Sequence, residues 1–174
     1  MKKLSNFYKI SQVSEKLKNR LRKLKLIKLS DGRFDVFGDV DFRDLELTSL
    51  LEIPIRIRRV DGDFWCFSNQ LTSLEGAPER VDGDFSCIWN NLTSLKGAPK
   101  FVGGSFDCHD NQLTTLKGAP ERVDGSFYCY NNQLTSLEGA PKYVGGNFDC
   151  SPNPKHFTEE EVRKLIDVRG KVIV

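Results

Sequence analysis

Five cysteines recur at one fixed interval, and cysteine thiolates are common ligands of structural zinc. The interval is 21 residues throughout, from Cys66 to Cys87, Cys108, Cys129 and Cys150. Zinc sites need clustered ligands at spacings such as C-x2-C, whereas this interval places the thiols in a line. Stacked strand neighbours also hold Cβ atoms about 5 Å apart, too far for a relaxed disulfide. We therefore interpret the cysteines as small buried core residues and expect no metal or cofactor.

The remaining reactive residues do not form a recognisable catalytic set. The chain has two histidines, His109 and His156, and no third group at a spacing that suggests a triad. The Val-Gly-Gly and Val-Asp-Gly turns recur in every repeat, so they are architecture rather than a phosphate-binding loop. Asp63, Asp84 and Asp107 could together hold a cation, but solvated acids are the simpler interpretation. The sequence thus predicts that the protein is not an enzyme.

Large aromatic residues occupy positions that the repeat turns outward. In Phe85-Ser86-Cys87 only the middle residue is polar, which predicts a short strand with Phe85 and Cys87 facing inward. The outward positions carry rings where a merely solubilising surface would not, and such rings are typical of interface hot spots. The predicted partner-binding residues are Trp65, Phe67, Ile88, Trp89, Asp107, His109, Tyr128 and Tyr130. The alternative is that these rings cover one another across adjacent strands.

Positive charge is concentrated at the start of the chain. Residues 1–30 contain ten Lys or Arg and one acid, so this segment carries +9 and the rest −7 in a chain of +2. The candidate nucleic-acid contacts, which would bind phosphates, are Arg20, Arg22, Lys23, Lys25 and Lys28. The alternative is a cap whose leucines cover the core while the charges stay in water. We favour the cap, because aromatic stacking groups and a known nucleic-acid fold are missing here.

An internal repeat of 21 residues positions all these side chains. One unit keeps its inward register at Val81, Phe85, Cys87, Leu92, Leu95 and Pro99. Asn90 follows the strand, where it can turn the chain and bond the backbone of a neighbouring coil. One unit cannot bury its own apolar face, so the repeats must stack, with parallel ladders about 4.8 Å apart. A fainter coil precedes these repeats; the link after it, through 52–59, is three residues longer than the others.

The repeat resembles the leucine-rich-repeat family. Its pattern Phe-x-Cys-x-x-Asn-x-Leu-Thr-Ser-Leu is similar to Leu-x-x-Leu-x-Leu-x-x-Asn-x-Leu, and its length and Pro-containing return resemble the short bacterial class. The whole string over residues 34–174, including 153–160, is similar to repeat proteins encoded by large tailed bacteriophages. The resemblance implies a leucine-rich-repeat solenoid that binds through its exposed sheet. The repeat departs from the family pattern at one position. Where the usual motif has its first Leu, this chain has Asp or Gly, and a Val stands one place earlier. This departure predicts a bend where the strand begins.

Three segments are expected along the chain. Residues 1–35 form a basic N-terminal cap, with a helix through Ile10, Leu17 and Leu24 and then a hairpin. Residues 36–157 form the mostly β solenoid of about five to six coils, with short parallel strands and an irregular, extended convex side, the last coil being truncated. Residues 158–174 form a C-terminal helical cap that opens on a Thr158–Glu161 capping box and closes with a strand.

The class of function follows from these expectations. No run of about 18 apolar residues and no signal-peptide core are present, so we expect the cytoplasm, which for a phage protein is that of the infected host. The predicted function is a non-enzymatic protein–protein interaction module acting on a host or phage partner. Two alternatives stay open: nucleic-acid binding through the basic segment, and a structural or assembly component of a virion.

Overall fold

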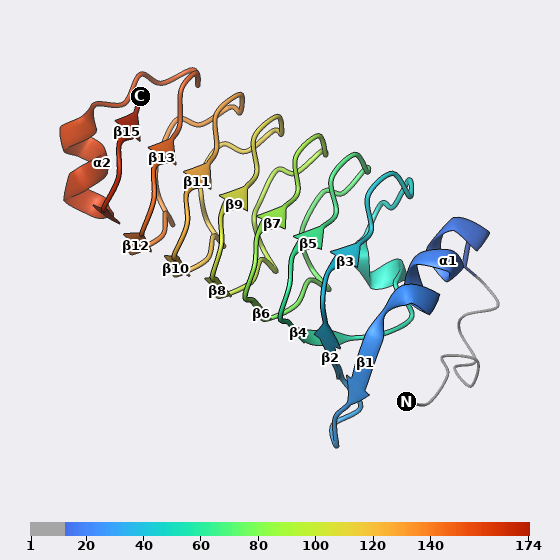
Figure 1. Ribbon diagram of the computed structural model, residues 1–174. Helices are drawn as coiled ribbons and strands as arrows, with labels where there is room; N and C mark the ends of the chain where they lie inside the picture. Colours follow the sequence, from blue (N-terminus) through green and yellow to red (C-terminus); the bar gives the residue numbers. More distant parts are fainter. Residues whose placement is uncertain (1–12) are drawn as a thin grey trace.

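The computed structural model describes residues 13–174, which form an elongated stack of coils with a helix at each end (Figure 1). Helix α1 (Glu15–Lys23) lies at the N-terminal end and α2 (Glu159–Leu165) at the C-terminal end. A short 3-10 helix, η3 (Leu50–Glu52), follows the first coil. The predicted β-solenoid with helical caps is confirmed, while Ile10 of the predicted N-terminal helix lies outside the described residues.

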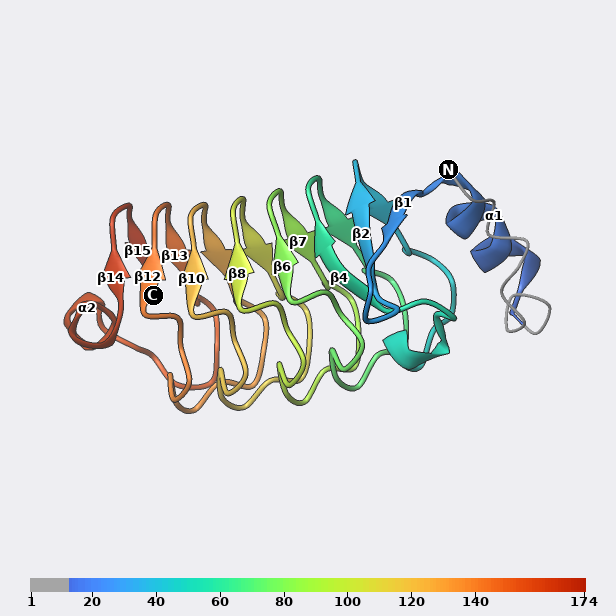
Figure 2. The same cartoon turned by 90° about the horizontal axis from the view of Figure 1, so that it is seen from below.

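Each coil contributes two short strands, so the stack carries two sheets (Figure 2). The eight-stranded sheet contains, in spatial order, β1 (Lys25–Lys28), β2 (Phe34–Phe37), β4 (Ile57–Val60), β6 (Arg80–Val81), β8 (Phe101–Val102), β10 (Arg122–Val123), β12 (Tyr143–Val144) and β14 (Asp167–Val168). The seven-stranded sheet contains, in the same direction, β3 (Val40–Asp41), β5 (Phe64–Trp65), β7 (Phe85–Ser86), β9 (Phe106–Asp107), β11 (Phe127–Tyr128), β13 (Phe148–Asp149) and β15 (Val172–Ile173). Every pairing is parallel except that of β1 with β2. The sequence predicted one strand per coil, whereas the structure has two.

The bend expected at the strand entry is what separates the two sheets. Val81 ends β6, the turn 82–84 redirects the chain, and Phe85 begins β7. Both Val81 and Phe85 are fully buried. The repeated valine therefore belongs to a strand of its own, and each coil presents two outer faces instead of one.

The solenoid extends further than the sequence predicted. The seven strands of the second sheet imply seven turns rather than five to six. Strands β14 and β15 follow α2 and pair with β12 and β13, so both ladders continue beyond residue 157. Helix α2 is thus inserted in the last turn, and the boundary expected at 157/158 does not end the stack.

The core consists of identical side chains stacked in columns. Consecutive phenylalanine rings from Phe64 to Phe148 lie 5.2–5.5 Å apart between centroids, with ring planes within 3–15° of parallel. The cysteines, valines and both leucine columns are buried beside them. Because each repeat stacks its side chains on identical side chains of the next coil, a single 21-residue register is enough to build a close-packed interior.

A buried asparagine joins each coil to the one before it. Asn111 Oδ1 accepts from the Leu92 backbone N–H (3.0 Å), and its Nδ2 donates to the carbonyls of Cys87 (3.0 Å) and Cys108 (3.2 Å). Asn90 and Asn132 make the equivalent bonds. Among residues 13–174 no buried side-chain nitrogen or oxygen lacks a partner. The role expected for this asparagine is confirmed.

The predicted caps are also seen. Leu17 and Leu21 of α1 are buried against the first coil, and Ser14 accepts from the Leu17 N–H (3.2 Å) as its N-cap. The hairpin of β1 and β2 forms as expected. At the other end Thr158 and Glu161 make both bonds of the capping box. Within residues 13–174 no helix is long and apolar enough to cross a membrane.

Candidate interaction surface

The predicted partner-binding residues gather on the outer side of the seven-stranded sheet. Trp65, Ser86, Asp107 and Tyr128 are register partners on consecutive strands. The next outward position of each coil holds Phe67, Ile88, His109 and Tyr130. We call this surface the aromatic–acidic face; its residues are Asp41, Arg43, Trp65, Phe67, Ile88, Trp89, Asp107, His109, Asp110, Tyr128 and Tyr130. The structure thus brings all the predicted residues together along one side of the stack.

Several rings of this face pack on one another. The His109 and Tyr130 rings are stacked, with centroids 4.3 Å apart and planes 15° apart. Trp89 meets the edge of His109 at 6.5 Å. Trp65, Phe67 and Tyr128, like His109 and Tyr130, are half-buried. The alternative that the rings cover one another is therefore correct for part of the face.

Trp89 is the exception, because it is 56% exposed. Its backbone lies in the left-handed region (φ 51°), as do Ser68, Asp110 and Asn131 at the same place in other coils. Asp and Asn tolerate this conformation, whereas a bulky residue loses about 1–2 kcal/mol there. The Trp89 Nε1–H donates to Asp110 Oδ2 at 3.1 Å, which holds the ring on the surface. Because Ser, Asp and Asn hold the same place in other coils, the turn does not require a tryptophan.

His109 lies between two carboxylates. Its Nδ1 is 2.5 Å from Asp107 Oδ1, and its Nε2 is 3.3 Å from Asp110 Oδ2. Burial raises the pKa of Asp107, although the His109 hydrogen bond partly opposes the rise. The pKa of Tyr130 is raised by burial and by the charges of Asp107 and Asp110. Since both ring nitrogens face acids, neither is left to activate a hydroxyl, and the cluster is not a triad.

Arg43 belongs to this face although the sequence did not indicate it. Its guanidinium lies over the rings of Trp65 (5.2 Å to the centroid) and Phe67 (5.4 Å). Its Nε–H also donates to Asp41 Oδ1 at 3.1 Å. Arg43 lies in the faint first coil, at the position that Phe67 occupies in the next coil.

The acids at 63 and 84, which we expected to be solvated, also bond to the scaffold: Asp84 is exposed and Asp63 is half-buried. Asp63 Oδ1 accepts from the Asp84 N–H, and Asp84 Oδ1 accepts from the Ser105 N–H, each at 2.7 Å. These carboxylates link one coil to the next. Among residues 13–174 no group of three or more His, Cys, Asp or Glu is placed to hold a metal ion.

The cysteines are free and buried, as expected for core residues. Cys66, Cys87 and Cys108 each donate the thiol proton to a carbonyl of the following coil at 3.3–3.5 Å. Burial raises the pKa of every thiol, and that of Cys150 reaches about 12. Thiols in this state are poor nucleophiles and poor metal ligands.

The basic candidate residues are divided between α1, which carries Arg20, Arg22 and Lys23, and β1, which carries Lys25 and Lys28. The guanidinium of Arg20 forms an ion pair with Asp41 of the aromatic–acidic face. Arg22 Nη1 donates to Asn19 Oδ1 at 2.9 Å. Part of the positive charge is therefore used within the chain, which fits a cap better than a phosphate-binding arm.

The outer side of the eight-stranded sheet is a second surface that the sequence did not indicate. It carries Arg59, Arg80, Phe101, Arg122 and Tyr143 in register. The Arg80 guanidinium lies 3.9 Å from the Phe101 centroid, and Arg122 lies 4.0 Å from that of Tyr143. Each of these arginines also pairs with an acid two residues later. A large residue precedes every repeated valine in the sequence, and this pattern could have indicated the second surface.

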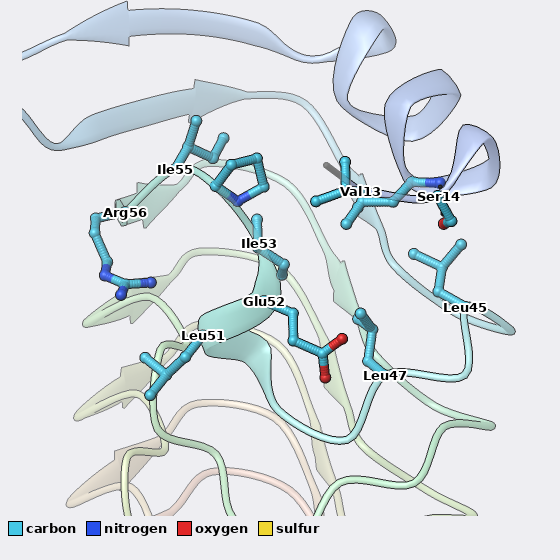
Figure 3. A pocket seen from close by; sticks show the side chains of 11 residues that line it. Val13, Ser14, Leu45, Leu47, Leu51, Glu52, Ile53, Ile55 and Arg56 are labelled. Atoms are coloured by element: carbon cyan, nitrogen blue, oxygen red, sulfur yellow. Dashed lines mark hydrogen bonds between the residues drawn. The ribbon is translucent and has the colours of Figure 1, made fainter. Parts of the chain in front are cut away.

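A pocket of about 490 Å³ lies under α1, at the N-terminal end of the stack (Figure 3). Its walls are mostly apolar, including Val13, Leu17 and Leu51. Its Glu52 carboxylate is occupied by bonds from Thr48 and Ser49 that cap η3. Val13 in the wall of the pocket is the first residue that the structure describes.

Fold and surface together define the class: a capped β-solenoid repeat protein with two outer sheet faces, one of them aromatic and acidic. No protein-family model, no curated protein and no solved structure matches the chain. The function is therefore argued from the surface itself.

Proposed function

We propose that the chain is a non-enzymatic interaction module that binds a partner protein through the aromatic–acidic face. Trp89 carries the proposal. A tryptophan that is 56% exposed, in a backbone conformation that disfavours it, contributes to the stack only through its bond to Asp110 and its edge contact with His109. Strained or exposed residues kept at the surface are typical of binding sites.

The composition of the face supports the same conclusion. Trp65, Phe67, Tyr128 and Tyr130 lie within a few strands of Trp89, and aromatic residues dominate interface hot spots. They sit on stacked coils, so the rings are held before any partner arrives and little ordering entropy opposes binding. The other outer face has its arginines already paired with acids and rings, which makes it the weaker candidate.

The resemblance to phage-encoded leucine-rich repeats supports a proposal about the cell in which the partner protein is found. We propose that the partner is a protein of an infected bacterial cell, encoded by the host or by the phage, and that binding takes place in the cytoplasm. This setting rests on the resemblance and not on the geometry of the face.

An affinity purification with matched variants tests the function. The tagged protein, the double variant Trp89→Ala/Tyr128→Ala and the control Phe101→Ala would be incubated with an infected-cell lysate, and the bound proteins compared by mass spectrometry. Phe101 is a half-buried ring on the outer side of the eight-stranded sheet. We expect the partner to be lost from the double variant alone. Equal recovery by all three proteins would refute the surface assignment.

A further inference from the structure

The aromatic–acidic face already shows how it holds one cation. Arg43 lies across the rings of the next coil, Trp65 and Phe67, while a carboxylate two residues earlier in its own coil, Asp41, accepts its Nε–H. A guanidinium is thus held by two aromatic rings and one acid. Such cation–π contacts beside a charge-assisted hydrogen bond are favourable for arginine in particular.

The same arrangement recurs further along the stack with a histidine in place of the arginine. In register, Asp107 occupies the place of Asp41, and Tyr128 and Tyr130 occupy the places of Trp65 and Phe67. His109 replaces Arg43. The imidazole is shorter, and it lies flat on Tyr130 with Asp107 at one nitrogen and Asp110 at the other.

Two properties of this second site favour a cation from outside. Among residues 13–174 the two carboxylates meet only the His109 ring and the Trp89 N–H as side-chain partners, and no Lys or Arg lies over the Tyr128 ring. Negative charge also converges here, since the Asp107, Asp110 and Asp149 carboxylates all act on the Tyr130 hydroxyl and contribute to its raised pKa. Exposed Trp89 borders the site and adds a further ring.

We propose that the site formed by Asp107, Asp110, Tyr128 and Trp89 binds the guanidinium of an arginine in a basic segment of the partner protein. This rests on the proposed function and names the chemistry of its partner. Arg43 is the internal counterpart of that arginine. Charge complementarity fits the assignment, because the chain beyond residue 30 carries −7 and this face concentrates acids beside rings.

Peptide binding tests the inference directly. The probe is the peptide Arg-Ser-Arg-Ser-Arg-Ser-Arg, compared with the same peptide carrying citrulline, which keeps the shape of arginine without its charge. Affinity would be measured by Trp fluorescence and calorimetry at low salt. We expect Asp107→Asn/Asp110→Asn to weaken binding about tenfold or more and Tyr128→Ala to weaken it about threefold. The controls Asp167→Asn and Tyr143→Ala, in the eight-stranded sheet, should bind like the parent protein.

Removal of the internal arginine provides a second readout of opposite sign. Arg43→Ala empties the Trp65–Phe67 site, so the peptide gains a second place to bind and its affinity should rise about threefold. Circular dichroism and urea midpoints would establish that each variant is folded.

Several outcomes would overturn the inference. They are equal affinity for the citrulline peptide, unchanged affinity in the acid variants, or an affinity that does not rise in Arg43→Ala. Self-association that the same variants abolish, without peptide binding, would assign the face to a second copy. If partner capture still depends on Trp89 while arginine binding fails, the proposed function stands and the arginine assignment falls.

Discussion

The asparagine column offers the sharpest test of how the coils are joined. In Asn111→Ala the buried Leu92 N–H loses its acceptor, and the carbonyls of Cys87 and Cys108 lose donors. An orphaned buried N–H costs about 1–3 kcal/mol and each weakened carbonyl about 1 kcal/mol. We therefore expect the free energy of unfolding to fall by about 3–5 kcal/mol, a large part of a typical total of about 5–15 kcal/mol.

The assay is urea unfolding, followed by circular dichroism and by Trp fluorescence. Gln133→Ala, an exposed position in the next coil, is the control and should change stability by less than about 0.5 kcal/mol. Asn111 lies in the middle of the stack, so its loss should weaken both halves together. A loss below about 1 kcal/mol with an unchanged slope would mean that water or a backbone shift replaces the bonds, and the reasoning would fail.

Three further predictions concern the scaffold. Gly104→Ala should destabilise the protein by about 2–3 kcal/mol in urea titrations, because its Cβ would meet the Gly83 carbonyl carbon at 2.7 Å. The control is Gly38→Ala, which lies in open space at φ +87° and should lose only about 1 kcal/mol. Equal losses in the two variants would contradict the close approach. The buried thiols should react with iodoacetamide far more slowly in the native protein than in urea, with Cys150 first because it is 2% exposed and the other four are 0% exposed; fast native labelling of all five would refute their burial. Burial raises the folded-state pKa of Asp107 above its ordinary 3.8, so stability relative to Asp107→Asn should fall as pH rises from about 4 through that pKa; midpoint differences independent of pH would contradict the shift.

The columns that build the interior could be predicted because each appears in every repeat. Five phenylalanines at one spacing leave little choice of fold, and the Phe-x-Cys alternation indicates which side faces inward. The second sheet could not be predicted in the same way. A strand such as Arg80–Val81 has one inward and one outward residue, which is too short to show alternation.

The site was only partly predictable for different reasons. The outward aromatics follow directly from the register of Phe and Cys. Arg43 did not, although Val40 and Phe42 place its coil in register, because its contact with the Trp65 ring depends on how two coils pack. Asp84 is exposed, as expected of a solvated acid, but its bond from the Ser105 N–H depends on the close approach of glycine backbones in adjacent coils, which the sequence does not show.

The separation of inward from outward columns has a consequence for how such a protein can change over generations. The four coils that begin at Val60, Val81, Val102 and Val123 are interchangeable as building blocks, because Val, Phe, Cys, Asn and the leucines recur in each. Their outward residues Trp65, Ser86, Asp107 and Tyr128, by contrast, differ within a single column. Duplication or loss of one 21-codon unit would leave the interior and both ends intact. It would nevertheless change the distance along the stack between Arg43 and the later residues Asp107, Tyr128 and Tyr130. The binding surface would then have a different arrangement after a single genetic step.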